Sequence, residues 1–394
     1  MPKLRFAGFE LEAWETKPLS EVCLRITNGK ANAEDHEEEG IYPLFDRSET
    51  VKKSQAYTFD GEVVILPGEG MRFQPRYYQG KFNLHQRAYA LMQFQQNAKF
   101  VFHTLDYMKD EIARKAVKST VLSLRLPIIK EFEIALPEAG EQEKIADCLS
   151  SLDACIGAET RKLDALKAHK QGLMQQLFPA EGQRLPRLRF AGFEGEWRSK
   201  PLGEVCEVLQ GYGFPEVLQG KTSGKYPFCK VSDVSRAVAN YGGLLSSAVN
   251  YVDDDELLKL RAKLIPKGAT VFAKIGEALR LNRRAFVQEQ CLIDNNVVGL
   301  KAVHGVADDY FVYLLSQLID LNEHCGGAVP SVNKTTLEAI EVVVPEPDEQ
   351  ERIANCLRTL DDVVAAQSRK IAALRKHKQG LMQSLFPAMD AHAV

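Results

Sequence analysis

The chain has 394 residues, of which 45% are hydrophobic and 26% charged, and its formal net charge is −3. This composition is typical of a globular protein of two or three domains and excludes a disordered or fibrous chain. No apolar window reaches the roughly 18 residues of a membrane span, and the opening residues lack the apolar core of a signal peptide. We therefore expect a cytoplasmic protein.

An internal repeat organises the chain. Residues 4–10 return as 188–194, and 21–23 return as 204–206. Residues 141–146 return with one change as 349–354, and 169–175 return as 377–383. Two repeated flanks thus enclose two dissimilar middles. A duplicated frame with different inserts is suited to a protein that reads two different things with one geometry.

The first middle is predicted to be α/β. Residues 63–66 are typical of a strand, 100–118 of a helix, and 132–136 of a closing strand. Basic residues outnumber acidic ones between Arg47 and Lys130, and arginine, lysine, asparagine and glutamine are the side chains that contact phosphates and base edges. The candidate DNA contacts here are Arg72, Gln74, Arg76, Lys81, Gln86 and Arg87, followed by Lys118, Ser119 and Arg125.

A long helix should follow each middle, because apolar residues recur every 3.5 residues for about five heptads. Prolines and acidic residues mark the starts of both helices, and Phe-Pro pairs mark their ends. Polar residues enter both seams at matched places, namely Glu159 with Gln367 and Lys170 with Lys378. We expect the helices to pack on each other, antiparallel, within one chain. The predicted seam residues are Ile145, Leu149, Leu152, Ile156, Leu163, Leu166, Leu173, Leu177, Ile353, Leu357, Leu360, Val364, Ile371, Leu374, Leu381 and Leu385.

The second middle is longer than the first and is also predicted to be α/β. Residues 270–273 and 340–344 are typical of strands, and 308–325 of an amphipathic helix. Basic residues outnumber acidic ones between Lys259 and Arg284. The candidate DNA contacts here are Tyr212, Lys274, Arg280, Asn282, Arg283, Arg284, Ser331, Asn333 and Lys334.

Catalytic and metal motifs do not assemble in this sequence. Gly220-Lys221-Thr222 resembles the end of a phosphate-binding loop, but Pro215 stands where that loop needs glycine. The cysteines and histidines are scattered without zinc-ligand spacing, and we expect no metal site. We also expect no catalytic residues in this chain.

The repeated motifs resemble the specificity subunit of type I restriction–modification systems. Residues 141–153 and 349–361 are similar to the start of that family's helical regions, and 170–179 and 378–387 to their end. Residues 14–19 and 197–202 are similar to the openings of its target-recognition domains. The resemblance implies an α+β fold with an internal pseudo-twofold repeat, in which two α/β target-recognition domains are joined by two long antiparallel coiled-coil helices. The expected parts are residues 1–137 and 184–345 for the domains, and 138–183 and 346–394 for the helices.

The resemblance further implies that each domain reads one half of a split, asymmetric site in double-stranded DNA, and that the helices set the spacing between the two halves. Two modification subunits would dock on the helices and carry S-adenosylmethionine, while restriction subunits would add ATP and Mg²⁺. No cofactor is expected in this chain. Two alternatives remain open: a single-chain DNA methyltransferase or nuclease, and a coiled-coil scaffold carrying two ligand-binding domains.

Overall fold

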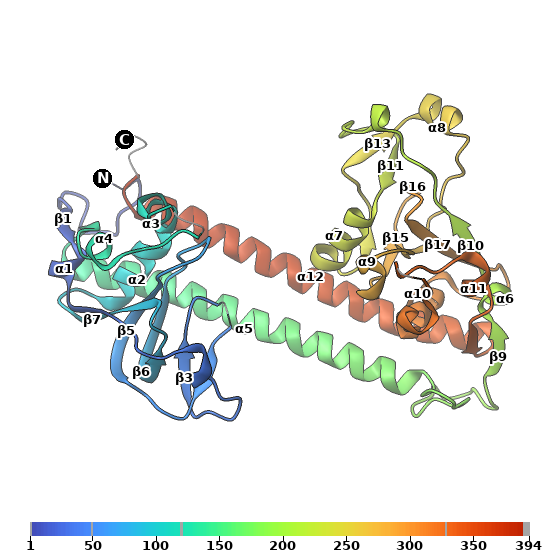
Figure 1. The fold of residues 1–394 in the computed structure, drawn as a ribbon, viewed down its shortest axis with the longest axis horizontal. Helices are drawn as coiled ribbons and strands as arrows, with labels where there is room; N and C mark the ends of the chain where they lie inside the picture. The colour runs from blue at the N-terminus through green and yellow to red at the C-terminus, as the bar shows by residue number, and fades with distance from the viewer. Residues whose placement is uncertain (1, 49, 119–120, 328, 389–394) are drawn as a thin grey trace. The chain divides into compact units, whose positions relative to one another are not determined.

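The structure, a computed structural model, describes residues 2–48, 50–118, 121–327 and 329–388 (Figure 1). It contains two compact units, of which only unit 2 is a continuous stretch of chain. Unit 1 comprises Met1–Thr160 and Ile371–Val394, and unit 2 comprises Arg161–Lys370. Each unit therefore holds one α/β domain together with one part of each long helix. The four-part division expected above stays a prediction.

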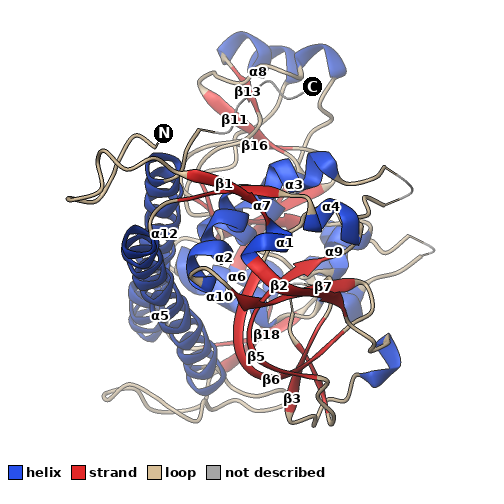
Figure 2. Cartoon of the chain, turned by 90° about the vertical axis from the view of Figure 1, so that its left-hand side faces the viewer, coloured by secondary structure: helices blue, strands red, loops and turns tan. Residues whose placement is uncertain are grey.

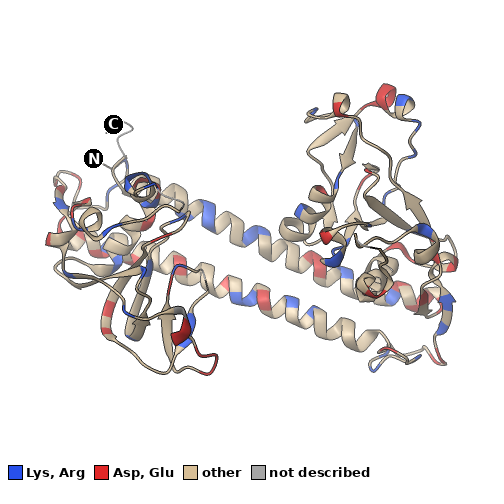
Figure 3. Cartoon of the chain, in the orientation of Figure 1, with Lys and Arg blue, Asp and Glu red and all other residues tan. Residues whose placement is uncertain are grey.

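Two long helices, α5 (Ala139–Leu177) and α12 (Pro347–Leu385), have 39 residues each. At 1.5 Å per residue, each spans roughly 58 Å. Both end directly before a Phe-Pro pair, since proline cannot continue the helix. None of the predicted seam residues is exposed. Basic and acidic residues are interspersed along the rest of both helices (Figure 3).

The helices run antiparallel, as predicted. In unit 1 the beginning of α5 packs against the end of α12, because Ile145 and Leu149 share a hydrophobic core with Leu385. In unit 2 the end of α5 packs against the beginning of α12, because Leu177 shares a core with Ile353. The start of one helix meets the end of the other in both units.

Among the described residues, the domain of unit 1 contains a six-stranded sheet in the order β2-β7-β5-β6-β3-β4, antiparallel except for β3 with β6. Gly61 and Gly80 lie opposite each other in β5 and β6 with positive φ, and helix α2 packs on these two strands (Figure 2). The elements are β1 (Glu15–Pro18), α1 (Leu19–Val22), β2 (Cys23–Asn28), η1 (Ala33–Asp35), β3 (Tyr42–Phe45), β4 (Lys52–Ser54), β5 (Phe59–Pro67), β6 (Arg76–Leu84), β7 (Ala88–Phe94), α2 (Ala98–Tyr107), α3 (Lys109–Lys115), α4 (Leu126–Lys130) and β8 (Glu133–Leu136).

The described part of unit 2 contains a five-stranded sheet, β10-β17-β14-β15-β12, and a three-stranded sheet, β13-β11-β16. The three-stranded sheet and the acidic helix α8 belong to the longer second middle. The elements are β9 (Arg198–Pro201), α6 (Leu202–Val205), β10 (Cys206–Gln210), η2 (Glu216–Leu218), β11 (Tyr226–Cys229), α7 (Val231–Tyr241), β12 (Leu244–Leu245), β13 (Asn250–Val252), α8 (Asp254–Leu260), β14 (Thr270–Ala273), α9 (Glu277–Arg280), β15 (Ala285–Val287), β16 (Leu292–Ile293), β17 (Val297–Ala302), α10 (Asp309–Leu318), η3 (Leu321–His324), α11 (Lys334–Glu338) and β18 (Glu341–Val344).

The sequence repeat is also a structural repeat. Strand β1 pairs with β8 as β9 pairs with β18, and the order β2-β7-β5 matches β10-β17-β14. Asn97 and Asp308 cap α2 and α10, and the backbone N–H groups of both caps donate to matched glutamines, Gln142 and Gln350, at 3.1 and 3.2 Å. The helix predicted over 100–118 is interrupted, because Met108 leaves the helical conformation and separates α2 from α3.

Matched contacts fasten each domain to the helix that follows it. Arg5 donates two hydrogen bonds to Glu141 at 2.6 and 2.7 Å, and Arg189 donates two to Glu349 at 2.8 Å each. Both glutamates are buried in the first turn of their helices, where the helix dipole also favours a negative charge. A bidentate arginine–carboxylate pair fixes the relative orientation of the two side chains as well as their distance. Each pair therefore orients its domain on its helix.

His103 makes the stability of unit 1 depend on pH. Burial, with a further contribution from the charge of Lys378, lowers the pKa of His103 to about 3, so the native imidazole is neutral at pH 7. The unfolded chain takes up this proton near pH 6.5 and the native chain does not. Stability should therefore fall as the pH drops from 7 to 5, by about 2 kcal/mol from this group.

Urea unfolding at pH 7 and pH 5 measures this dependence. His103→Gln retains a side chain that can hydrogen-bond Ser150, which lies 3.1 Å from His103 Nε2, but it cannot be protonated. The variant should lose about 2 kcal/mol less than the parent chain over this interval. Equal losses in the two proteins would show that His103 is not the group responsible.

Candidate nucleic-acid interface

In unit 1, the loop between β5 and β6 is tied to two other segments that carry candidate residues. The N–H of Gly68 donates to the carbonyl of Arg87 at 2.8 Å, and the carbonyl of Gly68 accepts from the N–H of Leu124 at 2.8 Å. A Cβ at position 68 would lie 2.7 Å from the Arg87 oxygen, so this close approach requires glycine. The structure thereby brings the loop 68–76, the turn at Arg87 and the segment 121–125 together.

The candidate residues of unit 1 fall into two groups. Arg72, Gln86, Lys118 and Arg125 are exposed, as phosphate or base contacts must be. Gln74, Lys81 and Arg87 are exposed as well and Arg76 is half-buried, but these four have partners within the domain. Gln74 donates to Asp106 at 2.7 Å, Arg76 donates to the Ser48 carbonyl, Arg87 pairs with Glu69 at 2.8 Å, and Lys81 Nζ lies 4.7 Å from the Tyr57 ring centroid. Ser119 lies outside the described residues.

In unit 2, the equivalent loop after β14 is tied in the same way. The N–H of Gly276 donates to the carbonyl of Pro330 at 2.8 Å, and the N–H of Val332 donates to the carbonyl of Lys274 at 3.0 Å. The segment that carries Lys274 and Arg280 therefore lies beside the segment that carries Ser331. Both units thus place the loop after a central strand against the segment that precedes the last short helix.

Two candidates in unit 2 need correction. Arg284 is only 4% exposed, its guanidinium lies 4.4 Å from the Phe272 ring centroid, and burial lowers its pKa to about 10. A side chain held under the surface in this way does not reach DNA. Asn282 has a positive φ, donates to the carbonyl of Ile319 at 3.1 Å, and accepts from Arg284 at 3.0 Å. These two residues shape the loop, and they are removed from the set of predicted contacts.

The remaining candidates of unit 2 differ in solvent exposure and in the partners that their side chains have within the domain. Arg280 is exposed and lies 3.7 Å from Glu277, while Arg283 is half-buried beside a cavity of about 460 Å³. Asn333 caps α11 by accepting from the N–H of Thr336 at 2.8 Å, so its side chain has a structural role. The others are Tyr212, half-buried after β10; Lys274, which donates to Gln210 at 3.1 Å; Ser331, exposed; and Lys334, exposed and 3.5 Å from Glu338.

Sequence reasoning missed the partners of the two seam lysines. Lys378 Nζ lies 2.7 Å from Asp153 in unit 1, and Lys170 Nζ lies 2.7 Å from Asp361 in unit 2. The sequence does contain a signal for these partners, because a Leu-Asp pair occurs at 152–153 and again at 360–361. A partly buried ion pair of this kind loses much of its energy when the helices shift, so it favours one register.

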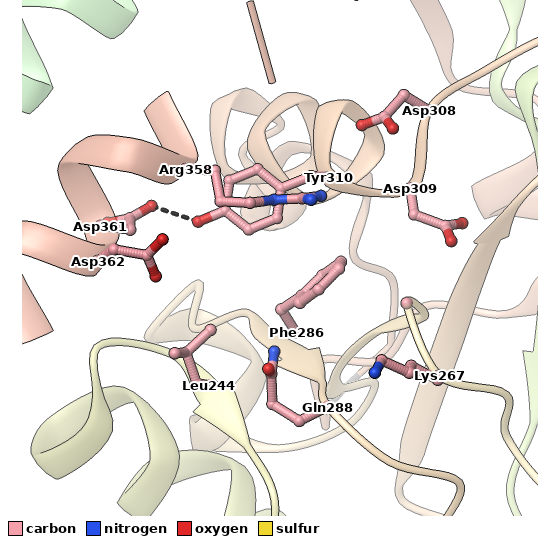
Figure 4. A pocket seen from close by; sticks show the side chains of 11 residues that line it. Leu244, Lys267, Phe286, Gln288, Asp308, Asp309, Tyr310, Arg358, Asp361 and Asp362 are labelled. Atoms are coloured by element: carbon pink, nitrogen blue, oxygen red, sulfur yellow. Dashed lines mark hydrogen bonds between the residues drawn. The ribbon is translucent and has the colours of Figure 1, made fainter. Parts of the chain in front are cut away.

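Around Asp361 the helix meets the domain of unit 2. Tyr310 donates to Asp361 at 2.6 Å, and the guanidinium of Arg358 lies 4.5 Å from the Tyr310 ring centroid (Figure 4). Burial, reinforced by Asp361, raises the pKa of Tyr310, so its hydroxyl remains a donor at neutral pH. These side chains line a cavity of about 560 Å³. The arrangement fixes α10 on α12.

The described ranges contain neither a cluster of metal ligands nor a helix suited to a membrane. No group of three or more His, Cys, Asp or Glu side chains there has a geometry that could hold a metal ion. No helix in those ranges is long and apolar enough to cross a membrane.

Comparisons with known proteins agree on one family. The model of the type I restriction modification DNA specificity domain matches residues 12–168 and 194–376. The putative type I restriction enzyme MjaX specificity subunit of Methanocaldococcus jannaschii is 24% identical, over 95% of this chain and 93% of its own length. The type I restriction enzyme EcoDI specificity subunit of Escherichia coli is 23% identical, over 95% and 88%.

A solved structure shares the fold. The crystal structure of the type I restriction–modification system S subunit from M. genitalium superposes with a TM-score of 0.69 at 15% identity, over 99% of this chain and 100% of that one. The family model covers most of the chain in two segments, one for each copy of the repeat. The chain belongs to the family of type I restriction–modification DNA specificity subunits.

Proposed function

We propose that this chain gives a type I restriction–modification complex its DNA specificity, and that each α/β domain reads one half of a split, asymmetric site in double-stranded DNA. The observation that carries the proposal is the repeat itself. Strands, caps and ion pairs are matched between the units, whereas the loops that follow β5 and β14 differ in sequence and length. A protein that reads two different half-sites can keep the same framework in both domains, but it needs different loops to contact different bases.

Exposed and half-buried polar side chains of these loops, and of the segments beside them, would supply the chemistry of recognition. Arginine binds guanine O6 and N7 with two hydrogen bonds, and glutamine binds adenine in the same way. Lysine and serine side chains bind phosphates, which fixes position without reading sequence. In unit 1 we assign this role to Arg72, Gln86, Lys118 and Arg125, and in unit 2 to Lys274, Arg280, Arg283, Ser331 and Lys334.

The long helices are proposed to hold two modification subunits. His169, Gln171 and Gln175 of α5 are exposed, and the same residues recur, also exposed, at His377, Gln379 and Gln383 of α12. Packing within the chain does not constrain exposed positions, so their identity in both copies favours two docking sites for the same partner.

A matched glycine supports docking on the same surface. Gly172 and Gly380 lie inside helices, where glycine is less stable than alanine by about 1 kcal/mol. Beyond the backbone of its own helix, a Cβ at either position would meet no atom within 4 Å, so packing on the rest of the chain does not explain the glycines. Close approach of a partner protein to these two positions would explain them.

The chain itself is proposed to be non-catalytic and cytoplasmic, and to hold no cofactor. S-adenosylmethionine would be carried by the modification subunits, and ATP and Mg²⁺ by restriction subunits. Titration calorimetry of the purified chain with S-adenosylmethionine should give no heat of binding, and methyl transfer to DNA should need the modification partner. Methyl transfer by the isolated chain would favour the single-chain methyltransferase instead.

A further inference from the structure

One contact of loop 68–76 in the first domain leads toward the long helices, namely the hydrogen bond between Gln74 and Asp106. Within loop 68–76, Phe73 and Pro75 are buried while Arg72 is exposed. The amide of Gln74 is tethered, because its Nε2 donates to Oδ1 of Asp106 on α2 at 2.7 Å. The middle of the loop thus has a buried apolar anchor at Phe73 and a polar tether at Gln74.

Asp106 connects this tether to the helices of unit 1. Its carboxylate accepts from Lys109 at 3.0 Å and lies 3.5 Å from Nζ of Lys378 on α12. Burial alone would raise the pKa of Asp106, but the hydrogen bonds from Gln74 and Lys109 and the nearby positive charges more than offset it, and the pKa lies below its usual range. Asp106 is therefore ionised at neutral pH.

Lys378 continues the connection into α5. It reaches Asp153 at 2.7 Å, and its side chain is only 13% exposed. His103 also lies 3.9 Å from Asp153, but its lowered pKa leaves it uncharged, so Lys378 is the cation that holds this carboxylate. A continuous polar path thus leads from the loop to both long helices: Gln74, Asp106, Lys378, Asp153.

The described residues of unit 2 show no equivalent tether at the same point. The matched caps Asn97 and Asp308 align α2 with α10, which places Gln317 where unit 1 has Asp106. Gln317 donates to the carbonyl of Tyr313 on its own helix at 3.4 Å. The seam lysine Lys170 is retained and pairs with Asp361, whose second partner is Tyr310 rather than a loop residue.

We propose that Asp106 is a positioning residue for target reading, which sets the recognition loop of the first domain against the ion pair of the two long helices. This inference rests on the proposed function, because it assumes that loop 68–76 reads DNA. Asp106 contacts no base; it acts through Gln74 and the backbone on either side of it. Base readout depends on side-chain placement to within about 1 Å, so a loosened loop should lose selectivity before it loses general affinity.

The test uses the chain assembled with its modification partner and DNA duplexes in which each base pair of the recognised site is changed in turn. Arg72→Ala identifies the half-site read by the first domain. Asp106→Asn and Lys378→Met should each reduce discrimination at that half-site about tenfold and leave the other half-site unchanged. Lys378→Arg, which retains the charge, should restore discrimination. Lys170→Met is the matched control and should leave the first half-site unchanged.

The outcomes separate this inference from the proposed function. If Arg72→Ala reduces discrimination while Asp106→Asn and Lys378→Met do not, the positioning role is wrong and the reading role of the loop stands. If Arg72→Ala has no effect at either half-site, the loop does not read DNA and both proposals fail. Equal losses at both half-sites would indicate general destabilisation and would overturn the positioning role.

Discussion

Phe386→Ala should lower the free energy of unfolding of unit 1 by about 3–5 kcal/mol, because it removes a fully buried aromatic side chain and leaves a cavity. Phe386 follows α12 directly and is 1% exposed. Its ring packs against Trp14, Phe100 and Tyr107 of the first domain, with centroid distances of 6.4, 5.8 and 5.2 Å. The end of α12 is therefore part of the core of that domain.

Phe178→Ala is the matched variant for unit 2. Phe178 follows α5, is 3% exposed, and lies 6.0 Å from Trp197 and 5.3 Å from Phe311. Hydrogen exchange measured by mass spectrometry locates the loss. Phe386→Ala should reduce protection in α2, and Phe178→Ala should reduce it in α10. Loss of protection in both helices with either variant would contradict two separately packed units.

Arg280→Ala and Arg283→Ala should each weaken DNA binding by the assembled complex about tenfold to a hundredfold, the usual effect of losing an arginine that contacts a base. Both variants should unfold at the same urea concentration as the parent chain, since Arg280 is exposed and Arg283 is only half-buried. Equilibrium binding at a fixed salt concentration measures this effect.

Arg284→Ala is the control, although Arg284 is the immediate neighbour of Arg283. Its guanidinium packs on Phe272 and donates to the carbonyl of Ile319 at 3.3 Å, so its removal should destabilise unit 2 by about 1–3 kcal/mol. Binding should weaken only as far as folding does. A loss of affinity with unchanged stability would return Arg284 to the interface and reverse the correction made above.

Much of the fold could be predicted because it follows from periodic signals. The heptad pattern that includes Ile145 and Leu149 specifies a helix whatever the tertiary context, and its second copy at Ile353 and Leu357 predicts a partner of equal length. Repeated motifs also predict that structural elements recur. The break at Met108 was not predictable, because it depends on the local backbone and not on hydrophobic periodicity.

The candidate site could be predicted only as a region. A cluster of basic residues after a strand indicates a binding loop, but Arg283 and Arg284 are adjacent and chemically identical. Only the packing of the chain decides that Arg284 lies over Phe272. Contacts between side chains that are far apart in the sequence could not be predicted either. Gln74 and Asp106 are far apart in sequence, and no periodic pattern links a loop amide to a carboxylate on α2.

Reading of one half-site by each domain can be tested by mapping the methylated adenines in DNA from cells that make this chain with its modification partner. The map is then repeated after residues 71–76 are exchanged for the corresponding loop of a relative. We expect a motif of two short halves separated by an unread spacer, in which the exchange alters one half and preserves the other. A single uninterrupted motif, or an exchange that alters both halves together, would contradict the claim that each domain reads its own half-site.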